Sequence, residues 1–180
     1  MSEAVAVGID YAALAGTGTS NQPTGLLAIT PGSGLANTQS ISLSAPPQWS
    51  DVLETQYLAE SANVRPDGTA AWVTSPASKK HLKSLPKVAS ASTLGFIWEA
   101  NQDEISGQRA FATQQVAATN QLIYSPRWSE LQVYLAGQVS LLVDRYSAAQ
   151  NNQTRVIVDA LVGVIARHAN AFVISTAGAN

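Results

Sequence analysis

The stretch that decides the fold prediction reads Gly16-Thr17-Gly18-Thr19-Ser20-Asn21-Gln22-Pro23-Thr24-Gly25-Leu26-Leu27. Its first two glycines allow the chain to reverse direction at positive φ. Pro23 restricts the residue before it to extended backbone geometry, and Gly25 allows another backbone to approach closely. A phosphate-binding loop needs a lysine at the start of a following helix, whereas this chain continues through Thr30-Pro31-Gly32-Ser33-Gly34. The residues therefore favour a structural turn. The alternative is a nucleotide-binding or hydrolytic enzyme domain that uses the GTGTS segment.

The GTG…QPTGLL string resembles the turn after the long helix in one family, the major capsid proteins of tailed phages with the Hong Kong 97 fold. Three further segments match that family in order and approximate spacing. Residues 70–82 resemble its strand, Ser-Pro corner and short helix, residues 124–147 resemble its passage ending in Asp-x-Tyr-Ser, and residues 156–173 resemble its closing strand. Four ordered motifs are more specific than any one of them, and they span nearly the whole chain.

The resemblance implies an α+β fold, the axial domain of a Hong Kong 97-like capsid protein with flanking peripheral-domain strands. Residues 1–45 are expected to be a remnant of the peripheral domain, residues 46–153 the axial domain, and residues 154–180 a long closing strand that returns to the peripheral domain. In the family an amino-terminal arm, an extended loop and most of a spine helix precede the GTG turn. The resemblance thus implies a carboxy-terminal fragment that lacks them.

The function implied is that of a major capsid subunit of a tailed phage or prophage, located in the virion and, during assembly, in the host cytoplasm. Its partners would be other copies of itself, arranged as pentamers and hexamers of an icosahedral shell. This role is structural rather than enzymatic. A β-rich bacterial surface module is a further alternative, which a secretion signal in the parent gene would favour.

Composition narrows the function classes. At 180 residues and 18.8 kDa, the chain is long enough to bury roughly 70% of its unfolded surface. A net charge of −2 with 12% charged residues gives no basic field for sequence-specific nucleic-acid binding. The absence of cysteine excludes disulfides and thiolate metal sites. The sequence contains no run of 18 apolar residues, so we expect no membrane partner.

No candidate catalytic, cofactor-binding or metal residue emerges from the motifs. The chain has no Gly-x-Ser-x-Gly elbow, and His81 lies beside lysines on a predicted solvated helix face. His168 is more typical of a turn than of a general base, and the adjacent Asp103 and Glu104 are poorly placed to face each other across a substrate. We therefore expect no cofactor and no metal.

The resemblance also raises a covalent cross-link, because some relatives join a lysine of the extended loop to an asparagine near the last strand, promoted by an acid. Asn152 and Asp159 occupy those two places here. We expect Asn152 to be a loop residue and Asp159 a strand residue. The chain departs from the family at Ser125-Pro126-Arg127-Trp128, where a glycine and an acid usually precede the aromatic residue.

Hydrophobic periodicity predicts helices over residues 3–14, 48–63 and 76–85, and strands over residues 70–74, 108–116, 121–124, 131–136, 139–143 and 154–166. A turn is expected at Gly137, between two of these strands. The expected core residues are Trp49, Tyr57, Trp72, Leu82, Val156, Val158 and Val162.

Residues 87–107 lack periodicity, and they predict a long loop that exposes Phe96, Ile97 and Trp98. By resemblance this is the axial loop, which meets its copies around fivefold and sixfold axes. A hairpin packed on the same domain is the alternative.

Overall fold

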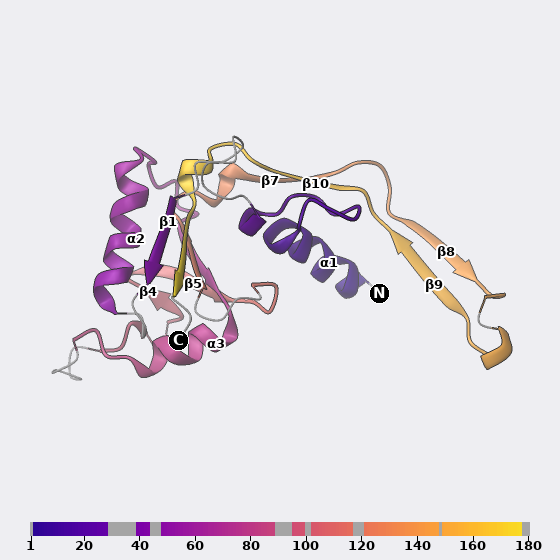
Figure 1. The fold of residues 1–180 in the computed structure, drawn as a ribbon, viewed down its shortest axis with the longest axis horizontal. Coiled ribbons are helices and arrows are strands. Elements are labelled where there is room, and N and C mark those ends of the chain that lie inside the picture. Colours follow the sequence, from indigo (N-terminus) through magenta and orange to yellow (C-terminus); the bar gives the residue numbers. More distant parts are fainter. Residues whose placement is uncertain are drawn as a thin grey trace.

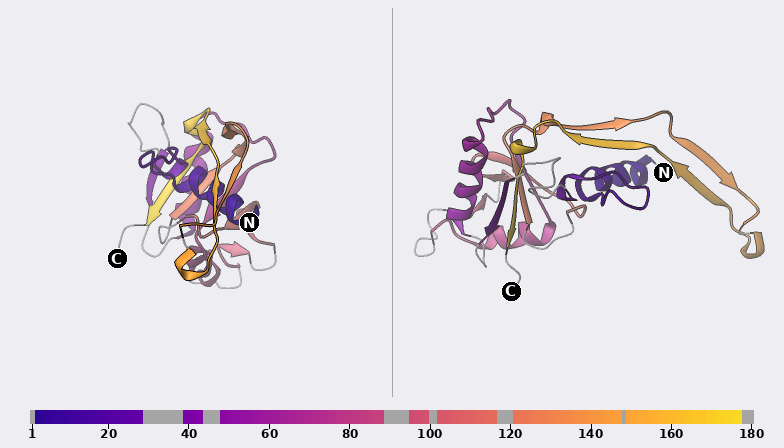
Figure 2. Two further views of the ribbon diagram at one scale, coloured as in Figure 1. Left: turned by 90° about the vertical axis from the view of Figure 1, so that its right-hand side faces the viewer. Right: turned by 45° about the horizontal axis from the view of Figure 1, so that its top comes forward.

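The computed structural model describes residues 2–28, 39–43, 48–88, 95–99, 102–116, 121–147 and 149–177. These residues form a head, built on a sheet, and a long two-stranded ribbon (residues 131–166) that extends away from it (Figures 1 and 2). Helix α1 (Ser2–Ala15) lies beside the ribbon, with its carboxyl end against the head.

In the part of the chain that the structure describes, the head sheet has seven strands, and several neighbours in the sheet are far apart in sequence. Their spatial order is β1 (Gln39–Leu43), β11 (Val173–Ala177), β6 (Gln121–Ser125), β2 (Ala71–Thr74), β5 (Gln108–Ala112), β4 (Glu104–Ile105) and β3 (Trp98–Glu99). The pairs β1–β11 and β2–β5 are parallel, and the other pairs are antiparallel. This mixed sheet with separate helices is the predicted α+β arrangement.

Helices α2 (Trp49–Ser61) and α3 (Pro76–Ser84) form where the sequence predicts them, because each has a defined start. The Gln48 backbone N–H donates to Asp51 Oδ2 at 2.8 Å, which closes a capping box on α2. At α3, the Ser78 N–H donates to Ser75 Oγ at 3.2 Å, and Pro76 occupies the first helical position. Both helices pack on the head sheet (Figure 1).

The core lies on both faces of the sheet, because successive residues of a strand point to opposite sides. On β6, Leu122 and Tyr124 face a cluster with Trp72 and the helices, where the Trp72 and Tyr124 rings lie 4.4 Å apart. Ile123 points the other way, into a second cluster with Leu26 and Phe172. The second cluster lies next to the GTG turn, so the turn connects α1 to the head.

The GTG turn is held by a close approach of two backbones. The Gly25 N–H donates to the Gly16 carbonyl at 2.8 Å, and a Cβ added at Gly25 would lie only 2.5 Å from the Gly16 nitrogen. Gly18 has φ +72°, and Thr17 and Thr24 form an isolated bridge. The predicted positive φ is found at Gly18 but not at Gly16, and the predicted close approach at Gly25 is confirmed.

The core prediction is confirmed for Trp72 and Leu82, which are fully buried, while Trp49 is half-buried. It is wrong for Tyr57, which is 61% exposed. The buried face of α2 carries Val52, Thr55 and Ala59, and Tyr57 is two residues from Thr55, on the far side of a 3.6-residue turn.

The predicted strand over residues 154–166 is two strands, β9 (Arg155–Asp159) and β10 (Val162–Ala166). Each pairs with a single partner in the ribbon rather than joining the head sheet. Val156 is therefore 38% exposed, and Val158 and Val162 are only half-buried. The alternating pattern predicted the strands correctly, but it did not indicate that their apolar side chains would stay partly exposed.

The expected exposure of Ile97 and Trp98 is wrong, since both side chains are buried in the core cluster. Strands β3 and β4 pair as a short antiparallel hairpin, and the Trp98 Nε1–H donates to Asp103 Oδ1 at 3.0 Å. For residues 95–99 and 102–107 the structure thus matches the alternative, a hairpin packed on the same domain. Residues 89–94 and 100–101 of the predicted loop lie outside the described ranges.

Candidate interaction surface

The ribbon consists of two pairs of strands in succession. In its proximal half β7 (Leu131–Leu135) pairs with β10, and in its distal half β8 (Ser140–Asp144) pairs with β9, both antiparallel. Gly137 has φ +89°, but β7 and β8 do not pair with each other as a hairpin. The chain instead continues outward past Gly137, so both halves project from the head (Figure 2).

Apolar side chains cover the ribbon without being buried. Of the eighteen large hydrophobic side chains that are exposed in the described ranges, eleven lie on the ribbon: Val133, Tyr134, Leu135, Val139, Leu141, Leu142, Val143, Tyr146, Val156, Leu161 and Ile165. Leu141, Leu142 and Val143 are consecutive and all exposed, so both faces of the distal half are uncovered. An isolated two-stranded hairpin is marginally stable, and contiguous exposed apolar surface usually marks an interaction site.

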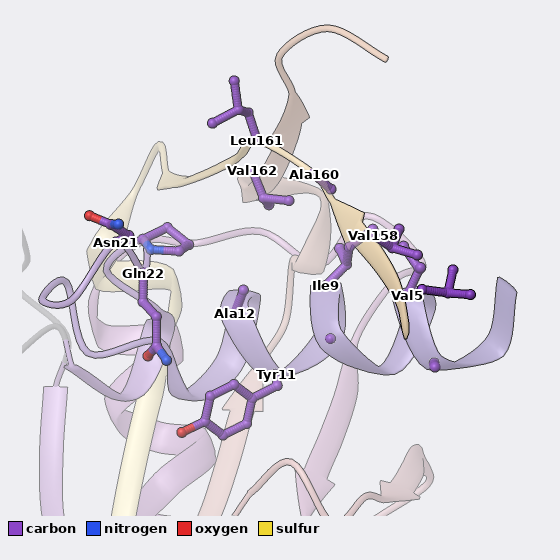
Figure 3. A pocket seen from close by; sticks show the side chains of 14 residues that line it. Val5, Ile9, Tyr11, Ala12, Asn21, Gln22, Val158, Ala160, Leu161 and Val162 are labelled. Atoms are coloured by element: carbon purple, nitrogen blue, oxygen red, sulfur yellow. The ribbon is translucent and has the colours of Figure 1, made fainter. Parts of the chain in front are cut away.

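Helix α1 extends this apolar surface. Only its carboxyl end, including Ala13, is buried against the head, while Val7 and Tyr11 are exposed. Between α1 and the ribbon lies a groove of about 680 Å³. Figure 3 shows Val5, Ile9 and Ala12 on the helix side and Val158, Ala160 and Val162 opposite them, while Tyr11 points away.

A polar cluster connects the base of the ribbon to the head. Glu130, in the short helix Trp128–Glu130, is buried, and its carboxylate lies 3.2 Å from Arg127 Nε and 2.8 Å from His168 Nδ1. Arg127 Nε also lies 3.3 Å from Asp67 Oδ2, on the turn that precedes β2. Ser129 donates a hydroxyl hydrogen bond to Asp67. The cluster thus joins three segments at the point where the ribbon begins.

Trp128 makes a second connection between the same segments. Its backbone N–H donates to Thr69 Oγ1 and its Nε1–H donates to the Ala71 carbonyl, each at 2.9 Å. Its ring packs edge-on against Phe172 at 5.5 Å. Residues 127 and 128 therefore help to fix the ribbon to the head.

The hydrogen bonds of the cluster favour the ionised carboxylates. The His168 side chain, and next the charges of His168 and Arg127, hold the pKa of Glu130 below its ordinary value of 4.5, although burial opposes this. Hydroxyl hydrogen bonds from Ser129 and Thr69 lower the pKa of Asp67 to about 2. Folding therefore favours the deprotonated form of both groups.

This shift predicts a pH dependence that Glu130→Gln should reduce. A carboxylate whose pKa is lower in the folded chain than in the unfolded chain stabilises the fold at any pH above its unfolded-state pKa. This stabilisation is lost as the pH falls through the folded-state pKa. We expect Glu130→Gln to be less stable than wild type at pH 7, and the two stabilities to converge as the pH falls through the lowered pKa of Glu130. Urea unfolding at several pH values measures this.

The control is Glu54→Gln, which removes a carboxylate from an exposed position on α2. Its stability should follow the wild-type curve throughout the acid range. Parallel curves for Glu130→Gln and wild type would contradict the role given to the Glu130 carboxylate.

The lysines of α3 and the acidic residue Asp103 lie on the head. Lys79 Nζ lies 2.8 Å from Asp103 Oδ1 and Lys83 Nζ lies 3.9 Å from it, so part of the basic face of α3 pairs with an acid. The hydrogen bond from Lys79, followed by that from Trp98, lowers the pKa of Asp103. His81 is exposed on α3.

The two cross-link positions lie apart. Asn152 has φ +53° in the loop after the short helix Ala149–Asn151, and Asp159 is the last residue of β9. The strand between residues 155 and 159 alone spans about 13 Å, at roughly 3.3 Å per residue. Asp159 of the same chain is therefore not adjacent to Asn152.

Sequence reasoning missed both the ribbon and the Glu130 cluster. The consecutive apolar residues Leu141-Leu142-Val143 were a signal for the ribbon, because a strand covered on one face alone should alternate. The cluster joins residues from three distant segments, and no local pattern indicates such a contact. The described ranges hold no group of three or more His, Cys, Asp or Glu side chains suited to a metal ion, and no helix there could cross a bilayer.

The solved structures that this one resembles include capsid chains. The structure superposes on the capsid chain of an empty GTA particle with a TM-score of 0.71 at 13% identity, covering 99% of this chain and 64% of that one. For Gordonia phage Cozz the TM-score is 0.61 at 18% identity, covering 100% of this chain and 62% of that one. The fold is therefore that of phage capsid proteins, as the α+β prediction and the resemblance implied.

Sequence comparison gives the family. The major capsid protein of Halomonas phage phiHAP-1 is 30% identical over 171 residues, which cover 95% of this chain and 26% of that protein. The chain thus spans about a quarter of this curated relative and just under two thirds of the two capsid chains. The family model described as "Phage capsid family" matches residues 1–177, and the chain belongs to that family.

Proposed function

We propose that this chain acts as a major capsid subunit of a tailed phage or prophage and that its copies associate into the pentamers and hexamers of an icosahedral shell. The observation that carries the proposal is the ribbon, whose apolar side chains are exposed on both faces. Such a surface is stabilised when another chain covers it. Family membership supports the same role, and the GTA particle whose capsid chain has a similar fold was computed with C5 symmetry.

The role is mechanical rather than catalytic. Its partners are other copies of the chain, with neither sequence-specific nucleic acid nor membrane among them, and its location is the virion after assembly in the host cytoplasm. A ring of copies needs contacts between two different patches of the same chain, because rotation about the ring axis brings unlike surfaces together. The ribbon projects away from the head, where another chain can contact it (Figure 2).

Within this proposal the head corresponds to the axial domain, and α1 with the ribbon corresponds to the peripheral domain. The expected boundaries near residues 45 and 153 then move, because β1 lies in the head sheet and the ribbon occupies residues 131–166. β11 returns the chain to the head between β1 and β6.

The proposal predicts that the chain associates through the ribbon. We expect wild type to form oligomers as its concentration rises, and Leu142→Glu to weaken this association about tenfold or more by placing a charge in an apolar interface. Leu142 is 58% exposed, so the thermal unfolding of the variant should match wild type. Sedimentation velocity measures the association, and electron microscopy of the oligomers tests for rings.

The matched control is Leu53→Glu, at an exposed leucine of α2 in the head. This variant should associate like wild type. A wild-type chain that stays monomeric at every concentration, or a Leu142→Glu variant that associates as tightly as wild type, would contradict the proposal.

A further inference from the structure

Helix α2 leaves two large side chains uncovered on the side away from the head sheet. Its buried face, which carries Val52, Thr55 and Ala59, packs on the sheet. Leu53 and Tyr57 are four residues apart, so they share the opposite face of the helix, and they are 46% and 61% exposed. Among the described residues, the fold of the head therefore provides no cover for this apolar pair.

The charges beside the pair have one sign. At 3.6 residues per turn, Glu54 lies on one side of the pair and Glu60 on the other, and both side chains are exposed. The helix contains no lysine or arginine, and no basic side chain in the described ranges forms an ion pair with either glutamate. We call Leu53, Glu54, Tyr57 and Glu60 together the α2 face. It has an apolar centre and acidic margins.

The position of α2 makes this face independent of the ribbon. The helix lies on the side of the head that faces away from the ribbon (Figures 1 and 2). It has 13 residues, so it is about 20 Å long and offers more than three turns to a partner. A partner bound there leaves the ribbon free to contact other copies of the chain.

The chemistry of the α2 face fits another helix. Paired helices bury apolar residues spaced by three and four positions, and opposite charges beside that stripe determine which helices pair. A helix with an apolar stripe flanked by lysine or arginine meets both requirements. Helix α3 of a second copy does not, because none of its exposed side chains is a large hydrophobic one, and its Lys79 and Lys83 already lie near Asp103. These features favour a different protein over a second copy.

We propose that the α2 face binds a basic amphipathic helix of another protein. The apolar stripe of the partner covers Leu53 and Tyr57, and its lysines or arginines pair with Glu54 and Glu60. Burial of the apolar pair supplies affinity, whereas the charges select the partner and its orientation. The contact needs one copy of this chain, so it does not depend on the association proposed for the ribbon.

The probe is a fluorescently labelled synthetic helix with one leucine stripe flanked by lysines, the Leu/Lys peptide. Its twin, the Leu/Glu peptide, has glutamate in place of every lysine. Fluorescence anisotropy measures the affinity of each peptide for the Leu142→Glu chain, in which the apolar ribbon competes less for the probe. We expect the Leu/Lys peptide to bind about tenfold or more tightly than its twin.

Reversing the charges of the α2 face should reverse this preference. In a chain with both Glu54→Lys and Glu60→Lys, the Leu/Glu peptide should bind the more tightly of the two. Tyr57→Ala should weaken both peptides, because it removes apolar contact and no charge. The matched control combines Glu3→Lys with Asp10→Lys, the same change of charge at exposed positions of α1, and should bind both peptides like the starting chain.

Three results would overturn the proposal. They are a Leu/Lys peptide that does not bind, one that binds the chain with a reversed α2 face as tightly as the starting chain, and one whose affinity Tyr57→Ala leaves unchanged. Thermal unfolding confirms that each variant keeps a folded head. Because each measurement involves one chain and one peptide, a chain whose copies fail to associate can still bind the peptide.

Discussion

Replacing Trp72 with alanine is expected to lower the free energy of unfolding by about 3–5 kcal/mol, the range for loss of a buried large aromatic side chain. Trp72 is fully buried at the centre of the head sheet, in a cluster with Val52, Ala59 and Leu82. Its ring also stacks on Tyr124 with centroids 4.4 Å apart. Urea unfolding followed by circular dichroism measures the change.

Two further variants separate packing from other causes. Tyr57→Ala removes an aromatic side chain that is exposed on α2, and its stability should stay within about 0.5 kcal/mol of wild type. Trp72→Phe keeps an aromatic ring and removes the indole N–H, which has no hydrogen-bond partner among the described residues, so its loss should be smaller than that of alanine. Equal losses for Trp72→Ala and Tyr57→Ala would refute the assigned core.

Gly25→Ala is expected to lower the free energy of unfolding by about 1–3 kcal/mol, the usual range for overpacking. The new Cβ would lie 2.5 Å from the Gly16 nitrogen and 2.9 Å from the Ala12 carbonyl oxygen. Both atoms belong to the backbone, so they cannot rotate away as a side chain can. The turn must open, and α1 loses its fixed position against the head.

Gly8→Ala provides a control of the same chemical change on α1. Its Cβ would meet no atom within 4 Å, and alanine in a helix interior is more stable than glycine by about 0.5–1 kcal/mol. The two substitutions should therefore have opposite signs in urea unfolding. A loss of stability for Gly8→Ala equal to that for Gly25→Ala would indicate a general sensitivity of α1 rather than a steric conflict in the turn.

The elements that could be predicted from the sequence are those with local chemical causes. Ser75-Pro76 fixes the start of α3 through a cap and a proline at the first helical position, and the glycines at 16 and 25 are required where two backbones meet. These features involve residues close in sequence, so their pattern is informative. The capsid resemblance rests partly on the same segments and was confirmed by the family match.

The partners of each strand could not be predicted in this way. Alternation along residues 154–166 indicates strands, but a strand in a two-stranded ribbon has the same backbone geometry as one in a buried sheet. Trp98 was expected to be exposed because residues 87–107 lack hydrophobic periodicity, whereas pairing of β3 with β4 buries it. The candidate interaction surface exists because no other described element covers the ribbon, and local sequence patterns do not indicate which strands stay uncovered.

The position of β11 has a consequence for biosynthesis. β11 lies between β1 and β6, although Gln39 of β1 must pair with Val173, which emerges from the ribosome long after it. Until residues 173–177 are made, β1 has no place in the sheet and β6 has an unpaired edge, a known site of aggregation. Pairing between such distant segments is slow, so the edge of β6 stays open to aggregation until β11 has been made.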